Sequence, residues 1–448
     1  MQETTMPLSP ACIKALDKLR RSATFAMSLG AKELFHTNFL AFVLESDEPQ
    51  LEELQKSLRN VLGLPWQEGE LTRCLVWREF KNLDLVLVAL EPTAGATLPT
   101  IRQRAVCVEV KLKSVPTPEQ LNDYSQKLAS GLKLVLPEEF NAPRAQIFGL
   151  HSESINKVLL SPRNATPPAP GWHWTNWQAV AALFTAVAQD PKEKDGLRAV
   201  LVDYGQALKD LHVVIDWVDA AFCEFQNNDL PFSALVEAMN DQGLRDRRLH
   251  DLAGKYFFSL LETAIRTAVV KQCTPLPDEW SLSSYTSFSR SIPMLGLEVT
   301  ATETRTSTKK KKIVEEKYRS VNIGVQIQGN SYRHYLAVTK PINVLEELAV
   351  ESFLGWFTNS PFEASMAGTM VDTNDIVRAI NGPRNVRHSN LKVFGKDKFL
   401  YSDVNCASAT FETLVAAVVK SITKAKELCT ADSMKCVRAA FIATNLPG

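Results

Sequence analysis

The sequence predicts an α/β domain in the first half of the chain and an α+β domain in the second. Helical apolar spacing near the N-terminus is followed by three apolar runs of strand length, at 71–80, 83–90 and 105–113. A helical segment and further strand-like runs come next, an order that indicates a mixed sheet flanked by helices. The second half combines long helical stretches with alternating strands.

The size and composition of the chain limit what it can be. Its 448 residues exceed one ordinary domain, and 45% hydrophobic with 22% charged residues is typical of folded globular proteins. Lys plus Arg and Asp plus Glu each number 50, so the formal net charge is zero. This balance argues against a protein that coats nucleic acid through its overall charge, and a nucleic-acid site would need a local basic groove.

Two features indicate where the domains divide. A Pro-rich stretch at 164–171 is linker-like, and a long helical pattern follows from about 196 to 225. We expect an α/β domain over 1–190, a helical connector over 191–230 and an α+β domain over 231–448. The last domain carries no motif that assigns it a role, so substrate binding, dimerisation and sensing of a trigger stay open.

The cysteines and the apolar runs predict a location. No pair of the eight cysteines has CxxC spacing, which favours a reduced protein without a structural zinc site. The N-terminus has no apolar signal segment, and the longest apolar runs are too short to cross a bilayer. We therefore expect a cytoplasmic protein that has no contact with membranes.

The first elements are predicted from their end signals. Ser9 and Pro10 open a helix that runs to about Leu29, where Gly30 can end it, and a second helix covers about 32–45.

The strand-like runs that follow are joined by short connections. Lys81 and Asn82 form a tight turn between the first two. After the third, a helix opens at Thr117 and continues to about 134, and strands follow at 145–152 and 157–162.

In the second half, a helix is expected over 249–271 and a hairpin over 321–339, with Gly-Asn-Ser at its turn. Further helices are expected at about 343–357 and 410–430. The lysine-rich run at 306–312 indicates an exposed loop or hairpin tip.

The strongest chemical signal is a pair of acidic residues and a lysine on neighbouring strands. Glu109 and Lys111 are two apart and therefore project from one face of a strand, while Val110 points into the core. Asp84 lies in the preceding apolar run, where a buried carboxylate needs a partner or a metal. Two such carboxylates suit Mg²⁺ or Mn²⁺, which bind hard oxygen ligands and retain water.

These residue types are the parts that phosphodiester hydrolysis needs. A metal neutralises charge on the phosphate and activates a bound water, which a neighbouring lysine can orient. Glu33, expected at the start of a helix, could hold a metal-bound water from the other side. Gln120 and Tyr124 are four apart and so share one face of the helix after the E-x-K strand.

The order of these residues resembles the PD-(D/E)XK, or restriction-endonuclease-like, superfamily of nucleases, and most closely an uncharacterised bacterial branch. The resemblance covers about residues 25–160 and is carried by GAKELFHTNFLAF, LDLVLV and EVKLKSVPTPEQLNDY. The sequence Asn82-Leu83-Asp84 departs from the Pro-Asp of the family pattern. The resemblance implies a restriction-endonuclease-like core in the first domain.

The resemblance also implies roles for individual residues. Asp84, Glu109 and Glu33 would bind Mg²⁺ or Mn²⁺, and Lys111 would position the attacking water. Gln120 would support catalysis, and Tyr124 would reach the site from the same helix to bind the substrate. The substrate would be nucleic acid, foremost DNA, in bacterial defence against foreign DNA (an antiviral role). A homodimer is compatible with such a protein.

Other interpretations remain open for each motif. An E-x-K strand can have a solvated face, and the fold could survive as a module that binds nucleic acid or protein without cleaving it. An RNase would show the same constellation. A glutamate in the first turn of a helix is stabilised by the helix dipole whatever its role.

Some residues have two readings. Lys113 could bind phosphate or end a strand in solvent. Trp172, Trp174 and Trp177 could stack on bases or pack in the core. The lysines at 309–312 could contact phosphate or be solvated.

Overall fold

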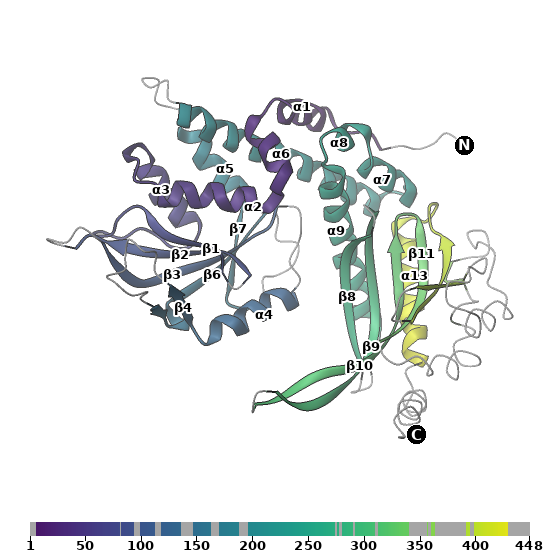
Figure 1. Cartoon of the computed structure of the whole chain (residues 1–448). Coiled ribbons are helices and arrows are strands. Elements are labelled where there is room, and N and C mark those ends of the chain that lie inside the picture. The colour runs from purple at the N-terminus through teal and green to yellow at the C-terminus, as the bar shows by residue number, and fades with distance from the viewer. Residues whose placement is uncertain are drawn as a thin grey trace. The chain divides into compact units, whose positions relative to one another are not determined.

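The computed structural model shows a mixed α/β protein with a mixed sheet flanked by helices and a separate antiparallel sheet (Figure 1). It describes residues 6–80, 82–93, 99–112, 118–135, 147–162, 170–187, 196–273, 276, 280–289, 292–309, 312–339, 356, 360–362, 391–394 and 398–428.

The chain divides into two compact units. The N-terminal unit comprises Leu8–Val218 and Asp241–Tyr256, and the C-terminal unit comprises the remaining residues. The division at Val218 lies within helix α6 (Gly196–Asn227), inside the predicted connector. Residues 241–256, which we expected in the second domain, belong to the N-terminal unit.

The chain begins with two helices whose boundaries follow from their caps. Ser9 opens α1 (Pro10–Leu19) by accepting a hydrogen bond from the Cys12 amide at 3.1 Å. The predicted end at Gly30 is wrong, because α2 (Ala23–Glu45) continues through it. The helices are instead separated at Ser22, whose side chain accepts from the Phe25 amide.

A residue far along the chain fixes this separation. The Asp203 carboxylate on α6 accepts hydrogen bonds from the Ser22 hydroxyl at 3.0 Å and from the Thr24 amide at 2.9 Å. The first amides of a helix have no acceptor within the helix. The Asp203 carboxylate provides one for Thr24 at the start of α2.

A short helix from beyond α6 packs on α1. In α8 (Gln242–Asp246), a Cβ added to Gly243 would lie 3.5 Å from the Leu16 side chain. Arg247, directly after α8, donates to the Leu16 carbonyl at 2.7 Å and pairs with Asp17 at 3.0 Å. These contacts tie 241–256 to the first helix of the chain.

The N-terminal unit is built around a five-stranded sheet in the order β1-β2-β3-β6-β7. Strands β1, β2 and β3 pair antiparallel, and β6 and β7 continue parallel to β3. Helix α2 covers one face and α4 covers the other (Figure 1). Helices α3 and α5 contact each other. The bounds are β1 Cys74–Phe80, β2 Leu83–Glu91, β3 Thr100–Val110, β6 Ile155–Ser161, β7 Trp172–Asn176, α3 Glu52–Val61, α4 Pro118–Ala129 and α5 Trp177–Ala186.

The connections between these strands partly follow the predictions. Phe80 pairs with Leu83, and Asn82 between them has a φ of 69°, so the tight turn is confirmed. The helix expected to reach 134 ends at Ala129, because Gly131 takes a φ of 75° and redirects the chain. Thr117, its predicted start, lies outside the described residues.

Two predictions in this region are corrected. Residues 132–135 form strand β4 (Leu132–Val135), which pairs with β5 (Ile147–Leu150) in a separate two-stranded sheet. The run at 145–152 therefore does not enter the main sheet. Strand β7, which was not expected, takes the edge position beside β6.

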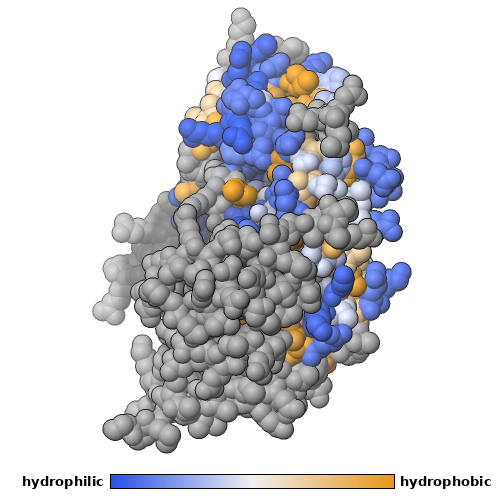
Figure 2. Space-filling model, turned by 90° about the vertical axis from the view of Figure 1, so that its right-hand side faces the viewer, coloured by the Kyte–Doolittle hydropathy of each residue, from blue (hydrophilic) through white to orange (hydrophobic). Residues whose placement is uncertain are grey.

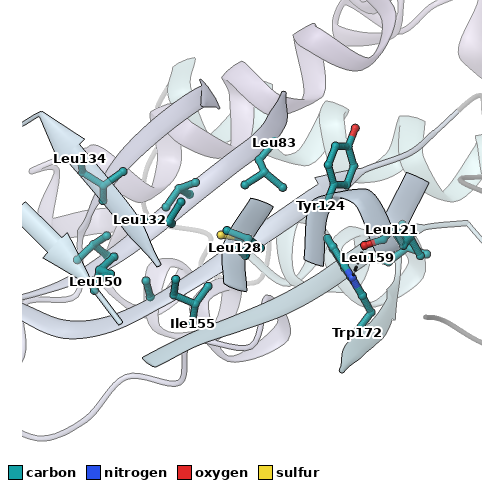
Figure 3. Packing of buried hydrophobic residues seen from close by; sticks show 14 residues of the cluster. Leu83, Leu121, Tyr124, Leu128, Leu132, Leu134, Leu150, Ile155, Leu159 and Trp172 are labelled. Atoms are coloured by element: carbon teal, nitrogen blue, oxygen red, sulfur yellow. Dashed lines mark hydrogen bonds between the residues drawn. The ribbon is translucent and has the colours of Figure 1, made fainter. Parts of the chain in front are cut away.

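The face of the sheet under α4 is closed by a hydrophobic cluster. Figure 3 shows Leu121, Tyr124 and Leu128 of α4 among side chains from the strands beneath. Val86, Val88, Ala105 and Cys107 also belong to the cluster. Ala105 and Cys107 show that the odd-numbered residues of β3 face α4. Because side chains alternate along a strand, Glu109 faces α4 as well.

The C-terminal unit is an antiparallel sheet in the order β12-β13-β11-β10-β9-β8, with helix α13 in contact with β9 and β10. The predicted hairpin is confirmed by the pair Gln328 and Ser331. Lys309 ends β9 and Lys312 begins β10, while Lys310 and Lys311 lie outside the described residues. The bounds are α7 Phe232–Met239, α9 His250–Gln272, β8 Trp280–Ser289, β9 Ile292–Lys309, β10 Lys312–Gln328, β11 Ser331–Thr339, β12 Leu391–Phe394, β13 Lys398–Asn405 and α13 Phe411–Leu428.

The face of the molecule in Figure 2 is mixed in hydropathy where its residues are described. In Figure 2 hydrophobic residues form small patches among hydrophilic ones. Within the described ranges, no helix combines the length and hydrophobicity needed to cross a bilayer. The helix predicted at 343–357 lies, apart from Trp356, outside those ranges.

His334 is buried in the C-terminal unit as a neutral imidazole. Its Nδ1 donates to the Trp356 carbonyl at 2.8 Å, because a carbonyl can only accept. Nε2 then accepts from the Ser421 hydroxyl at 2.8 Å, and that hydroxyl accepts from Tyr332. Burial lowers the pKa of His334 to about 4. A proton on Nε2 would place two donors against each other.

This burial predicts a loss of stability on acidification. An unfolded histidine takes up a proton near pH 6.5, whereas folded His334 resists protonation until about pH 4. Stability from this group is full above pH 6.5 and falls by about 3 kcal/mol as the pH drops to 4. Urea midpoints at pH 7 and pH 4 should show a smaller loss for His334→Gln than for the wild type. Equal losses would contradict the prediction.

Candidate functional site

The structure brings Asp84, Glu109 and Lys111 together. The Lys111 Nζ lies 2.7 Å from Glu109 Oε1 and 3.8 Å from Asp84 Oδ2. These three groups come from β2 and from the end of β3, which are neighbours in the sheet. Two carboxylates and an ammonium thus share one small volume.

The local geometry follows from how the β2–β3 ladder ends. Its last backbone pair at this end is Leu85 with Val108. Beyond it, Asp84 Oδ2 accepts the Val110 amide hydrogen at 2.7 Å. The carboxylate therefore replaces a backbone carbonyl as the acceptor, and this bond fixes Asp84 beside Glu109.

Glu109 is a buried acid whose environment opposes its charge. Its side chain is 1% exposed, and among the described residues its Oε2 has no hydrogen-bond partner. Burial raises the pKa of Glu109 to about 7, the Lys111 charge opposes this rise, and the Asp84 charge adds to it. A buried carboxylate oxygen without a partner is costly, which makes it a good place for a cation.

Helix α4 adds two polar groups from above the sheet. The Gln120 side-chain amide donates to Glu109 Oε1 at 3.3 Å and to the Tyr124 hydroxyl at 2.9 Å. Burial raises the pKa of Tyr124, so its hydroxyl stays protonated at neutral pH. Figure 3 shows Tyr124 above the cluster, near Trp172. The expected proximity of Gln120 and Tyr124 to the E-x-K strand is therefore observed.

Lys111 itself lies just past β3 and is fixed by two backbone hydrogen bonds. Its amide donates to the Leu160 carbonyl at 2.8 Å, and its carbonyl accepts from Trp177 Nε1 at 2.9 Å. Trp177 is 1% exposed, and its ring lies 5.4 Å from that of His36. This support could not be predicted from the sequence, because the indole is 66 residues away along the chain.

Trp177→Phe should destabilise the N-terminal unit more than Trp174→Phe does. Phenylalanine retains most of the ring but leaves the buried Lys111 carbonyl without its donor, at a cost of about 1–3 kcal/mol. Trp174 Nε1 also makes a hydrogen bond, but its side chain is 36% exposed, so water can replace the lost partner. Urea denaturation of both variants would measure the difference. Equal losses would argue against this role of Trp177.

The side chains of two predicted site residues lie outside the described part of the structure. Glu33 lies well inside α2, which begins at Ala23, so it is not in a first helical turn and the helix-dipole argument does not apply to it. Its side chain is outside the described part of the structure. Lys113 also lies outside the described residues.

The donors at the site fit a small divalent cation. Mg²⁺ typically binds one or two protein carboxylates and keeps several waters. Asp84 and the Oε2 atom of Glu109 can provide these carboxylate oxygens. In the described part of the chain, no cluster of three or more His, Cys, Asp or Glu residues could hold a metal. A cation here would therefore depend on two protein carboxylates and water.

Sequence reasoning missed Ser161, which lies at the end of the strand beside β3. Ser161 ends β6 and is 2% exposed, and it accepts a hydrogen bond from Trp174 Nε1 at 3.0 Å. Its only signal was a polar residue at the end of an apolar run. Trp174 was expected either to stack on bases or to pack in the core, and its place in a strand was not predicted.

Comparison with known proteins adds no assignment. No family model, curated protein or solved structure matches this chain.

Proposed function

We propose that this protein is a metal-dependent nuclease of the PD-(D/E)XK type that hydrolyses phosphodiester bonds. The observation that carries the proposal is the meeting of Asp84, Glu109 and Lys111, with Lys111 Nζ within 4.0 Å of both carboxylates. A chance E-x-K on a solvated strand face would not leave Glu109 1% exposed beside a second acid.

The order of elements supports a restriction-endonuclease-like core. We expected two opening helices, a mixed sheet and a helix after the E-x-K strand in the first domain. Helices α1 and α2 precede an antiparallel β1-β2-β3 unit, and α4 leads towards β6, parallel to β3. The order of helices and strands in the N-terminal unit is the feature that supports such a core.

Each side chain has a distinct task in the proposed reaction. Bound Mg²⁺ or Mn²⁺ would neutralise charge on the phosphate and lower the pKa of a bound water. Asp84 and Glu109 would hold the cation. The Lys111 ammonium would orient the attacking water and stabilise charge that develops on the phosphate oxygens. Gln120 keeps Glu109 oriented through its bond to Oε1.

The substrate and setting are part of the proposal. DNA is the first candidate, and RNA offers the same scissile group. A cytoplasmic enzyme of bacterial defence, acting as a monomer or homodimer, fits the resemblance described above.

One observation favours a rival function. The Lys111–Glu109 ion pair at 2.7 Å gives the acid a partner without any metal. A nuclease-fold module that binds nucleic acid or protein but lacks activity would have such a closed pair.

Incubation with plasmid, single-stranded DNA and RNA tests the proposal. Wild-type protein should degrade at least one of them in Mg²⁺ or Mn²⁺ and none in EDTA, and Glu109→Gln should be inactive. Electron paramagnetic resonance during a Mn²⁺ titration should show that the wild type binds the ion and that Glu109→Gln binds it with lower affinity. If all substrates stay intact and no Mn²⁺ binds, the proposed nuclease activity is wrong, and the binding module is the function that remains.

A further inference from the structure

The three tryptophans near the site differ in exposure. Trp172 and Trp177 are 4% and 1% exposed, and their indoles donate to the Leu121 and Lys111 carbonyls. These two rings are core. Trp174 is 36% exposed, although it lies in the same short segment. Trp174 therefore presents a large aromatic surface to solvent near the candidate site.

Trp174 lies on the same sheet face as the site. Trp172 belongs to the cluster under α4, and Trp174, two residues later in β7, projects from that same face. Leu159 of β6 pairs with Glu109 on one side and with Trp174 on the other. Two strand spacings therefore separate Glu109 from Trp174, roughly 10 Å across the sheet.

The Trp174 ring is held in one position. Its Nε1 donates to the Ser161 hydroxyl at 3.0 Å, and Ser161 is 2% exposed. Ser161 follows Leu160, whose carbonyl accepts the Lys111 amide hydrogen. The indole and the lysine are thus fixed to neighbouring residues of β6. Because the ring is already held in place, binding a ligand on it would cost little side-chain entropy of the protein.

We propose that Trp174 is a stacking platform for an unpaired nucleobase, so that the substrate of this site is single-stranded or locally unpaired nucleic acid. The inference rests on the proposed nuclease function. With its only donor used by Ser161, the indole offers a hydrocarbon surface rather than a hydrogen bond. A base has a π-face whatever its sequence, and inside a duplex both faces are already stacked.

The separation suits one strand. About three stacked nucleotides at ~3.4 Å each span 10 Å, so a base on Trp174 and a phosphate at Glu109 would belong to the same short stretch. The platform would therefore position the strand for cleavage as well as bind it.

Equilibrium binding of a fluorescent oligothymidylate 15-mer, in EDTA, tests the platform. Trp174→Ala should weaken binding by about 5- to 150-fold, the usual range for one stacked base, and Trp174→Phe should recover part of it. Binding of a blunt duplex of equal length should change less than about twofold. The matched control is Phe42→Ala, which removes another exposed ring, 49% exposed, from α2. Equal melting temperatures would show that the variants are folded.

The outcomes separate this inference from the nuclease proposal. Wild-type affinity of Trp174→Ala for the 15-mer, or an equal loss for the duplex, would overturn the platform. If that variant also cuts single strands in Mn²⁺ like the wild type, the nuclease stands without the platform. If nothing is cut but 15-mer binding depends on Trp174, the platform stands and the nuclease falls.

Discussion

Lys111→Ala is expected to lower the rate of substrate cleavage by about 100- to 1,000-fold, the usual effect of removing one charge-stabilising donor from a reaction centre. Lys111 Nζ lies 2.7 Å from Glu109 Oε1 and 3.8 Å from Asp84 Oδ2. Its loss removes the group proposed to orient water. It also removes the charge that lowers the pKa of buried Glu109. Initial rates on a labelled oligonucleotide in saturating Mn²⁺ measure the effect.

The control for this variant is Lys133→Ala, which deletes an exposed lysine on β4. It should cleave at the wild-type rate, since Lys133 contributes only to the outer charge of the unit. A Lys111→Ala protein with more than a tenth of the wild-type rate would remove Lys111 from the mechanism.

Asp84 has two roles that two variants can separate. Asp84→Asn retains an oxygen that can accept the Val110 amide hydrogen but loses the carboxylate charge, whereas Asp84→Ala loses both. Each variant should lower Mn²⁺ affinity by at least ~100-fold, because even partners outside the first ligand shell contribute 10- to 100-fold. Cleavage should fall with metal binding in both.

The two Asp84 variants should differ in stability. Alanine leaves the Val110 amide without its acceptor, at a cost of about 1–3 kcal/mol that asparagine avoids. Mn²⁺ titrations and urea denaturation of both proteins provide the comparison. Asp123→Asn is the control, because Asp123 on α4 is 66% exposed and pairs only with Lys127 among the described side chains. Unchanged Mn²⁺ affinity in Asp84→Asn would exclude Asp84 as a ligand.

The centre of the site was predictable because it depends on local rules. Residue alternation placed Glu109 and Lys111 on one face, and the two-residue turn at Asn82 made β1 and β2 neighbours. Helical spacing placed Gln120 and Tyr124 together. In each case the deciding interaction joins residues close in sequence or on adjacent strands.

The errors arose where distant residues decide. Asp203 fixes the start of α2, and Gly30 was misread as a stop, although a glycine inside a helix costs only about 1 kcal/mol. Gly131 did contain the signal for the end of α4, but Leu132 continues the helical spacing of Leu128 and hid it. The support of Lys111 by Trp177 depends on tertiary packing alone.

The packing of α8 on α1 has a consequence for synthesis of the protein. Leu16 leaves the ribosome well before its partner Arg247, which follows 231 positions later. Until then α1 lacks the contacts that Gly243 and Arg247 make with Leu16. Such late closure slows folding and invites chaperone binding to the nascent chain. A chain truncated near residue 230 would leave α1 permanently without these contacts.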